Sequence, residues 1–106
     1  MAKKVLGQVN PSAATPQTLY TVPSAKSAVV STLVVANLAS SAATYRVAIR
    51  PAGATLASTH YIAYDVALSA NDSTALTLGI TLATTDIITV YASSANVNFS
   101  AFGDEA

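Results

Sequence analysis

The sequence has no cysteine and no tryptophan, and charged residues make up only 9% of its 106 residues. Without cysteine it has no disulfide framework, no thiol nucleophile and no thiolate metal ligand. An ordinary soluble domain carries roughly 25% charged residues. Five Lys and Arg residues balance five Asp and Glu residues, so no net field attracts nucleic acid. We expect neighbouring proteins to cover part of so weakly charged a surface.

Long apolar runs are missing as well. No run approaches the roughly 18 apolar residues that a membrane-spanning helix needs. The apolar run near the N-terminus, Val5-Leu6, is too short for the hydrophobic core of an export signal. We therefore expect synthesis in the cytoplasm and no membrane partner.

Recognisable catalytic patterns are also absent from the sequence, which contains no G-x-S-x-G elbow and no glycine-rich phosphate loop. His60 is the only histidine, whereas a metal site needs about three or four convergent ligands. In a strand, His60, Ile62 and Tyr64 would share one face. Tyr61 and Asp65 would lie on the other, so His60 and Asp65 cannot pair as base and orienting carboxylate. We predict no enzyme and no cofactor, and interpret His60 as a structural or interface residue.

The residues that are present favour β-structure. Runs rich in Val, Ile, Thr and Tyr alternate with turns containing Pro, Gly, Asn and Asp. Alternation is clear in residues 43–50, where Tyr45 and Val47 share one face and Arg46 and Arg50 the other. The expected strands are 18–22, 27–37, 43–50, 60–68, 73–80, 86–93 and 96–102. The pattern predicts an all-β fold, an antiparallel and jelly-roll-like β-sandwich of about seven strands over residues 17–106.

Residues 1–16 differ from the rest of the chain. Pro11 and Pro16 disfavour both helix and central strand. We therefore predict an extended N-terminal arm over residues 1–16 that lies on a neighbouring subunit. The contact residues expected in this arm are Lys3, Lys4, Val5 and Leu6.

Arg46 and Arg50 are the only arginines. They form either a solvated face of the sheet or an inter-chain contact, because arginine is enriched at interfaces and grips carboxylates with a planar fork. Tyr64 is a further contact candidate. Five basic residues without an aromatic platform make no nucleic-acid footprint, so we expect no nucleic-acid partner.

Several segments carry a resemblance to a known group of proteins. They are LYTVP, VVSTLVVAN, ATYRVA and the closing VYASSANVNFSAFG. Across about residues 17–103 the chain resembles small virion proteins of tailed bacteriophages. The resemblance implies a β-sandwich structural module that acts as an oligomer, either as capsid cement or as a tail or fibre component. It brings no catalytic residues.

We therefore expect a structural component of a tailed-phage virion, first of all a capsid cement (decoration) protein that stabilises the head by binding between capsid subunits. Its partners would be further copies of itself, as a trimer or dimer, and a major capsid or tail protein. A tail, baseplate or fibre-attachment protein is the alternative. A second alternative is a carbohydrate-binding module for host recognition, with Tyr61 or Tyr64 stacking on sugars; the absence of Trp and the spread of five Tyr residues weigh against it.

Overall fold

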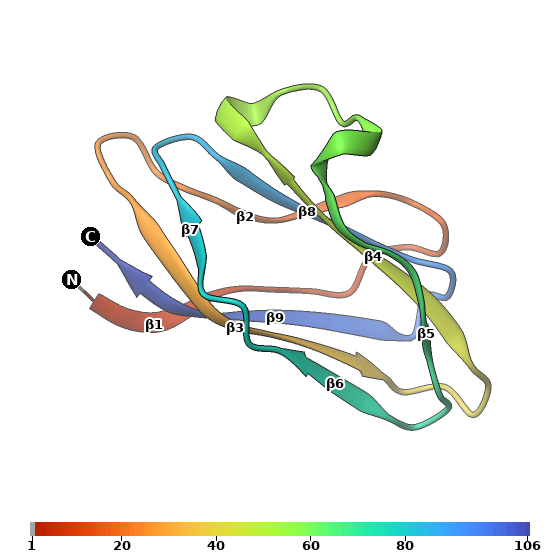
Figure 1. The fold of residues 1–106 in the computed structure, drawn as a ribbon. Coiled ribbons are helices and arrows are strands. Elements are labelled where there is room, and N and C mark those ends of the chain that lie inside the picture. The colour runs from red at the N-terminus through yellow and green to blue at the C-terminus, as the bar shows by residue number, and fades with distance from the viewer. Residues whose placement is uncertain (1) are drawn as a thin grey trace.

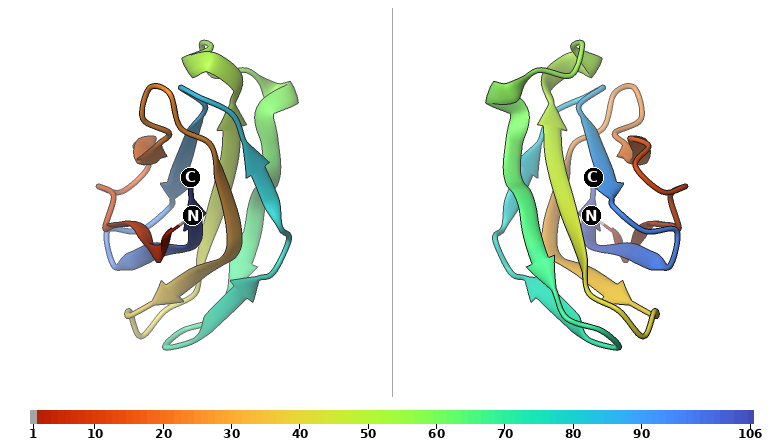
Figure 2. Two further views of the ribbon diagram at one scale, coloured as in Figure 1. Left: turned by 90° about the vertical axis from the view of Figure 1, so that its left-hand side faces the viewer. Right: turned by 90° about the vertical axis from the view of Figure 1, so that its right-hand side faces the viewer.

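The computed structural model describes residues 2–106, which form two antiparallel β-sheets packed face to face (Figures 1 and 2). Short 3-10 turns, η1 (Pro51–Gly53) and η2 (Ser58–His60), lie in the connection between the fourth and fifth strands. The nine strands of the described residues are β1 (Ala2–Val9), β2 (Gln17–Thr21), β3 (Ala28–Asn37), β4 (Ala43–Arg50), β5 (Tyr61–Leu68), β6 (Ser73–Leu76), β7 (Ile80–Leu82), β8 (Ile87–Ala92) and β9 (Val97–Glu105).

The strand order is that of a jelly roll. One sheet has the order β1-β9-β3-β6, and β7 pairs with β3 beside β6. The other sheet has the order β2-β8-β4-β5. When β6 and β7 are taken as one interrupted strand, the two sheets have four strands each and the order of two Greek keys, which is the jelly-roll arrangement. The predicted all-β antiparallel sandwich is confirmed.

The core lies between the two sheets and follows the alternation of the strands. Leu33 and Val35 of β3 face Val47 of β4, and all three are fully buried. Tyr45 of β4 meets Phe99 of β9 edge-on, with ring centroids 6.4 Å apart. This aromatic contact joins the two layers, and such pairs add stability beyond the area they bury.

The extended arm expected over residues 1–16 is not shown. Residues 2–9 form β1, which pairs with β9 from Ala2 opposite Glu105 to Val9 opposite Phe99. Leu6 and Val9 pack against the core, so this strand completes the sheet of its own subunit. Both prolines come after β1 and do not interrupt it; Met1 lies outside the described residues.

Several other strand boundaries differ from the prediction. The run 73–80 is broken into β6 and β7 near Gly79, whose φ is +63°. A residue in the left-handed conformation interrupts regular strand pairing, and glycine adopts this conformation at no steric cost. His60 ends η2 and does not begin β5. The division of the run 73–80 and the addition of β1 raise the strand count of the described residues from about seven to nine.

No helix formed by residues 2–106 is long and apolar enough to cross a membrane.

Candidate binding surface on the outer face of the four-stranded sheet

A bulge in β5 shapes the outer face of the sheet β2-β8-β4-β5. Tyr45 lies opposite Val66 and Val47 opposite Ala63, so the register shifts between them. Two β5 residues, Tyr64 and Asp65, thus stand opposite the single residue Arg46. Asp65 has a φ of +49°, in the left-handed region. Bulges of this kind re-aim side chains at sheet edges.

A second register shift brings Tyr61 and Tyr64 together, because Ala48 lies opposite Tyr61 and Val47 opposite Ala63, which leaves Ile62 as an extra residue between the two tyrosines. Simple alternation predicted that these rings lie on opposite faces, and that prediction was wrong. Their ring centroids are 4.9 Å apart with an interplanar angle of 79°. This edge-to-face arrangement is a favourable geometry for aromatic pairs. The bulge at Tyr64 and Asp65 follows directly after this second shift, so β5 is irregular from Tyr61 to Val66.

Arg46 lies between two tyrosine rings. Its guanidinium carbon is 4.2 Å from the ring centroid of Tyr64 and 4.1 Å from that of Tyr91, which is its neighbour on β8. Its Nε donates to Asp65 Oδ1 at 2.6 Å and its Nη2 to Asp65 Oδ2 at 3.2 Å. The hydrogen bonds to Asp65 raise the pKa of Arg46 above its ordinary value. The fork and both faces of this guanidinium are therefore engaged within its own chain.

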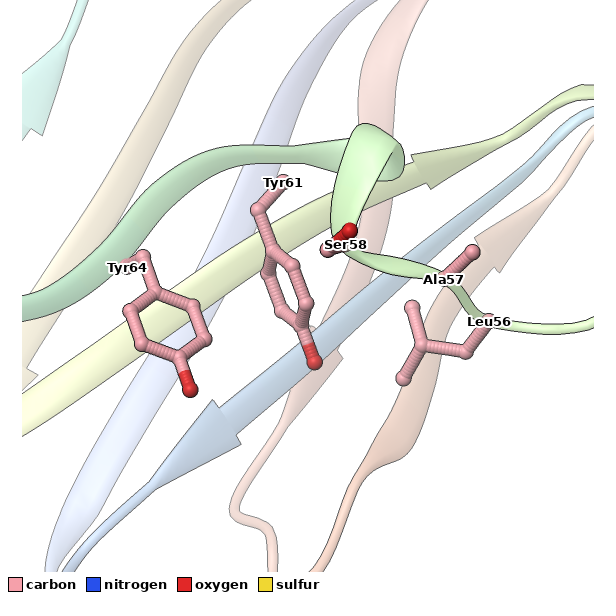
Figure 3. Close-up of a pocket in the computed structure, with 5 residues that line it drawn as sticks. All are labelled: Leu56, Ala57, Ser58, Tyr61 and Tyr64. Atoms are coloured by element: carbon pink, nitrogen blue, oxygen red, sulfur yellow. The ribbon is translucent and has the colours of Figure 1, made fainter.

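A shallow hollow of about 540 Å³ opens beside this cluster. Its lining residues are Leu56, Ala57, Ser58, Tyr61 and Tyr64. Figure 3 shows the two tyrosines side by side with their hydroxyl groups pointing the same way, and Leu56 to Ser58 beyond Tyr61. Leu56 and Ala57 belong to the connection between η1 and η2. All five lining residues are uncharged, and two of them present aromatic rings.

Apolar side chains are also exposed along β5, at the edge of the sheet. Ile62 is 46% exposed, Tyr64 56% and Val66 39%. We call these three residues the β5 edge. Native proteins usually guard edge strands with charge, proline or bulges; β5 has bulges and Asp65 but leaves these three apolar side chains uncovered. Such a strip is suited to contact with another protein.

The other predicted contact residues lie elsewhere. Lys3, Lys4 and Val5 line a hollow on the other sheet, where the Nζ of Lys4 is 2.9 Å from Glu105 Oε1. Val5 is 50% exposed, whereas Leu6 packs on the core. The structure therefore separates these residues from Arg46 and Tyr64.

Arg50 and His60 take no part in the Arg46 cluster. Arg50 is partly buried, and no described residue accepts a hydrogen bond from its buried Nε. The Nδ1 of His60 accepts a hydrogen bond from the backbone N–H of Ala57 at 3.0 Å. Within residues 2–106, no group of three His, Asp or Glu side chains gathers as a metal site requires.

Sequence reasoning missed Tyr91 and Leu56 as members of this surface. The alternation of residues 86–93 could be recognised in the sequence, but the register between β4 and β8 that places Tyr91 beside Arg46 could not. Leu56 follows Pro51 and Gly53 in a segment with no periodicity, so no pattern placed it over a sheet.

No family model matches the chain, and neither a curated protein nor a solved structure matches it significantly.

Proposed function

We propose that this protein is a structural component of a tailed-phage virion, acting as a capsid cement protein that binds between capsid subunits and associates with copies of itself. The single observation that carries this function is the β5 edge, where Ile62, Tyr64 and Val66 are exposed on a strand with no further partner in its sheet. The jelly-roll order adds an analogy at the level of the fold, because viral capsid domains use it. The low charge content is a further support.

The size of the β5 edge indicates how such binding works. Covering the exposed parts of Ile62 and Val66 contributes about 1 kcal/mol each. Even a millimolar complex needs about 4 kcal/mol of binding free energy. One edge is therefore a weak contact, and stable attachment to a particle depends on further contacts within an oligomer, which raise the effective concentration.

The first test is the abundance of the protein in purified virions, measured by quantitative mass spectrometry. A copy number comparable with that of the major capsid protein is the result expected for cement. A much lower copy number would assign the protein to the tail, baseplate or a fibre attachment instead. Absence from the particles would overturn the virion function.

The second test changes the β5 edge. In the double variant Ile62→Asp and Val66→Asp, charge replaces two apolar side chains that are not part of the core. We expect co-sedimentation with capsids and self-association to be lost while the thermal melt is retained. The control is Leu38→Asp, which changes a residue that is 62% exposed and lies just after β3. Equal binding by the double variant and the control would contradict this role of the edge.

Because residues 2–9 form β1, deleting residues 1–10 should have a different outcome from deleting a free arm. The deletion removes β1, exposes the paired edge of β9 and uncovers the core beside Leu6 and Val9. An unprotected central strand promotes aggregation. We therefore expect the truncated protein to be less stable and to aggregate, whether or not it binds particles.

A further inference from the structure

We propose that the hollow formed by Leu56, Ala57, Ser58, Tyr61 and Tyr64 binds a neutral hexose unit of a glycan. This site would give the protein a sugar-binding activity in addition to its structural function. The argument has three parts, which are the aromatic rings, the uncharged polar atoms and the rigidity of the cluster.

The rings supply a surface for the apolar face of a sugar. A pyranose ring presents C–H groups on its faces and hydroxyl groups around its rim. Tyrosine matches this pattern because its ring is apolar and its hydroxyl both donates and accepts hydrogen bonds. Tyr61 and Tyr64 stand side by side in the hollow with their hydroxyl groups on the same side (Figure 3).

The polar side chains of the hollow are uncharged. Three of its lining residues, Ser58, Tyr61 and Tyr64, carry hydroxyl groups, which both donate and accept hydrogen bonds. The nearest charges, on Arg46 and Asp65, neutralise each other in a two-pronged ion pair. An anionic ligand therefore meets no free cation beside Tyr64, whereas a neutral polyol meets three hydroxyl groups. This balance favours a neutral hexose over a sialic acid, a uronic acid or a phosphate.

The cluster is rigid before a ligand arrives. Tyr64 is held between the guanidinium of Arg46 and the ring of Tyr61. Arg46 is in turn held by Tyr91 and Asp65. A preorganised aromatic site loses little side-chain entropy on binding. The volume of about 540 Å³ lies within the range of small-ligand sites.

The test is ligand-observed saturation-transfer NMR on the full chain, with methyl glycosides of glucose, galactose and mannose and their neutral disaccharides as probes. We expect at least one neutral probe to bind. Tyr61→Ala should weaken this binding by about tenfold or more, because stacking on an aromatic ring is lost. Tyr61→Phe, which keeps the ring and removes the hydroxyl, should weaken it less. The absence of binding by every neutral probe would overturn the proposal.

Three controls locate the site. Val5→Ala changes an exposed residue on the other sheet, and this variant should bind the sugar probe as the parent does. A loss of sugar binding equal to that of Tyr61→Ala would overturn the assignment to this hollow. Leu56→Ala tests the opposite wall and should also weaken binding, which keeps the proposal testable if Tyr61→Ala misfolds. Binding of sialyllactose alone would overturn the neutral specificity. Because these assays contain no capsid, their outcome is independent of the Ile62→Asp and Val66→Asp test.

Discussion

Replacing Gly103 with alanine should destabilise the protein far more than replacing Gly79 with alanine. Gly103 lies in β9, between Lys4 of β1 and Val30 of β3. A Cβ atom at this position would overlap the carbonyl oxygen of Val29 and lie 3.0 Å from the Cα of Val30. Both obstacles are backbone atoms of a paired strand, so a side-chain rotation cannot relieve the overlap.

The structure sets the expected size of the effect. Separating β9 from β3 at Gly103 breaks about two ladder hydrogen bonds, each worth about 1 kcal/mol net, and overpacking adds about 1–3 kcal/mol of strain. The expected loss is about 3–5 kcal/mol, out of a total of roughly 5–15 kcal/mol for a domain. At Gly79 nothing lies within 4 Å of the new atom, so Gly79→Ala costs only about 1–2 kcal/mol, for its positive φ.

Thermal and urea unfolding followed by circular dichroism measure both variants. Each kcal/mol lowers the Tm of a domain of this size by about 4–8 °C, so Gly103→Ala should melt at least about 12 °C below the parent. The Tm of Gly79→Ala should lie between that of Gly103→Ala and that of the parent. If Gly103→Ala is as stable as Gly79→Ala, β9 and β3 do not approach as described, and the register of the sheet is wrong.

Three further predictions follow from other contacts. Glu105 accepts hydrogen bonds from Tyr20 and Lys4, which lower its pKa below the ordinary value of 4.5. The stability that the charged Glu105 contributes is therefore complete above pH 4.5 and is lost as the pH falls through the lowered pKa. Thermal melts of Glu105→Gln at different pH values should lack this acid-dependent part of the stability. Phe99→Ala empties a fully buried site and should cost about 3–5 kcal/mol in urea unfolding. Arg46→Lys keeps the charge but loses the planar fork and stacking, so NMR should show changed ring-current shifts beside the two flanking tyrosines; unchanged shifts would contradict the stacked arrangement.

The fold was largely predictable from local patterns. The run 43–50 alternates cleanly and ends at Pro51, and β4 has those bounds, Ala43–Arg50. β1 was missed because its two lysines and the nearby prolines resemble a loop. Its strand partner, β9, lies about a whole chain length away in the sequence, and no local pattern reports such a pairing.

The candidate surface was less predictable because it depends on irregularity. A period of two assigns Tyr61 and Tyr64 to opposite faces, and the register shift at Ile62, an extra residue between them, brings them to the same face. One extra residue in a strand exchanges the faces of all residues beyond it. Arg46 was recognised as a contact candidate, but its partners within the chain were set by the register of β4 with β5 and β8.

The position of β9 bears on how the protein is made. The strand β9 lies between β1 and β3, so the sheet to which all three belong cannot close until β9 has been synthesised. Until then, β1 and β3 lack the strand that joins them. We expect the nascent chain to remain open to chaperones or to early contact with sister chains until β9 has emerged.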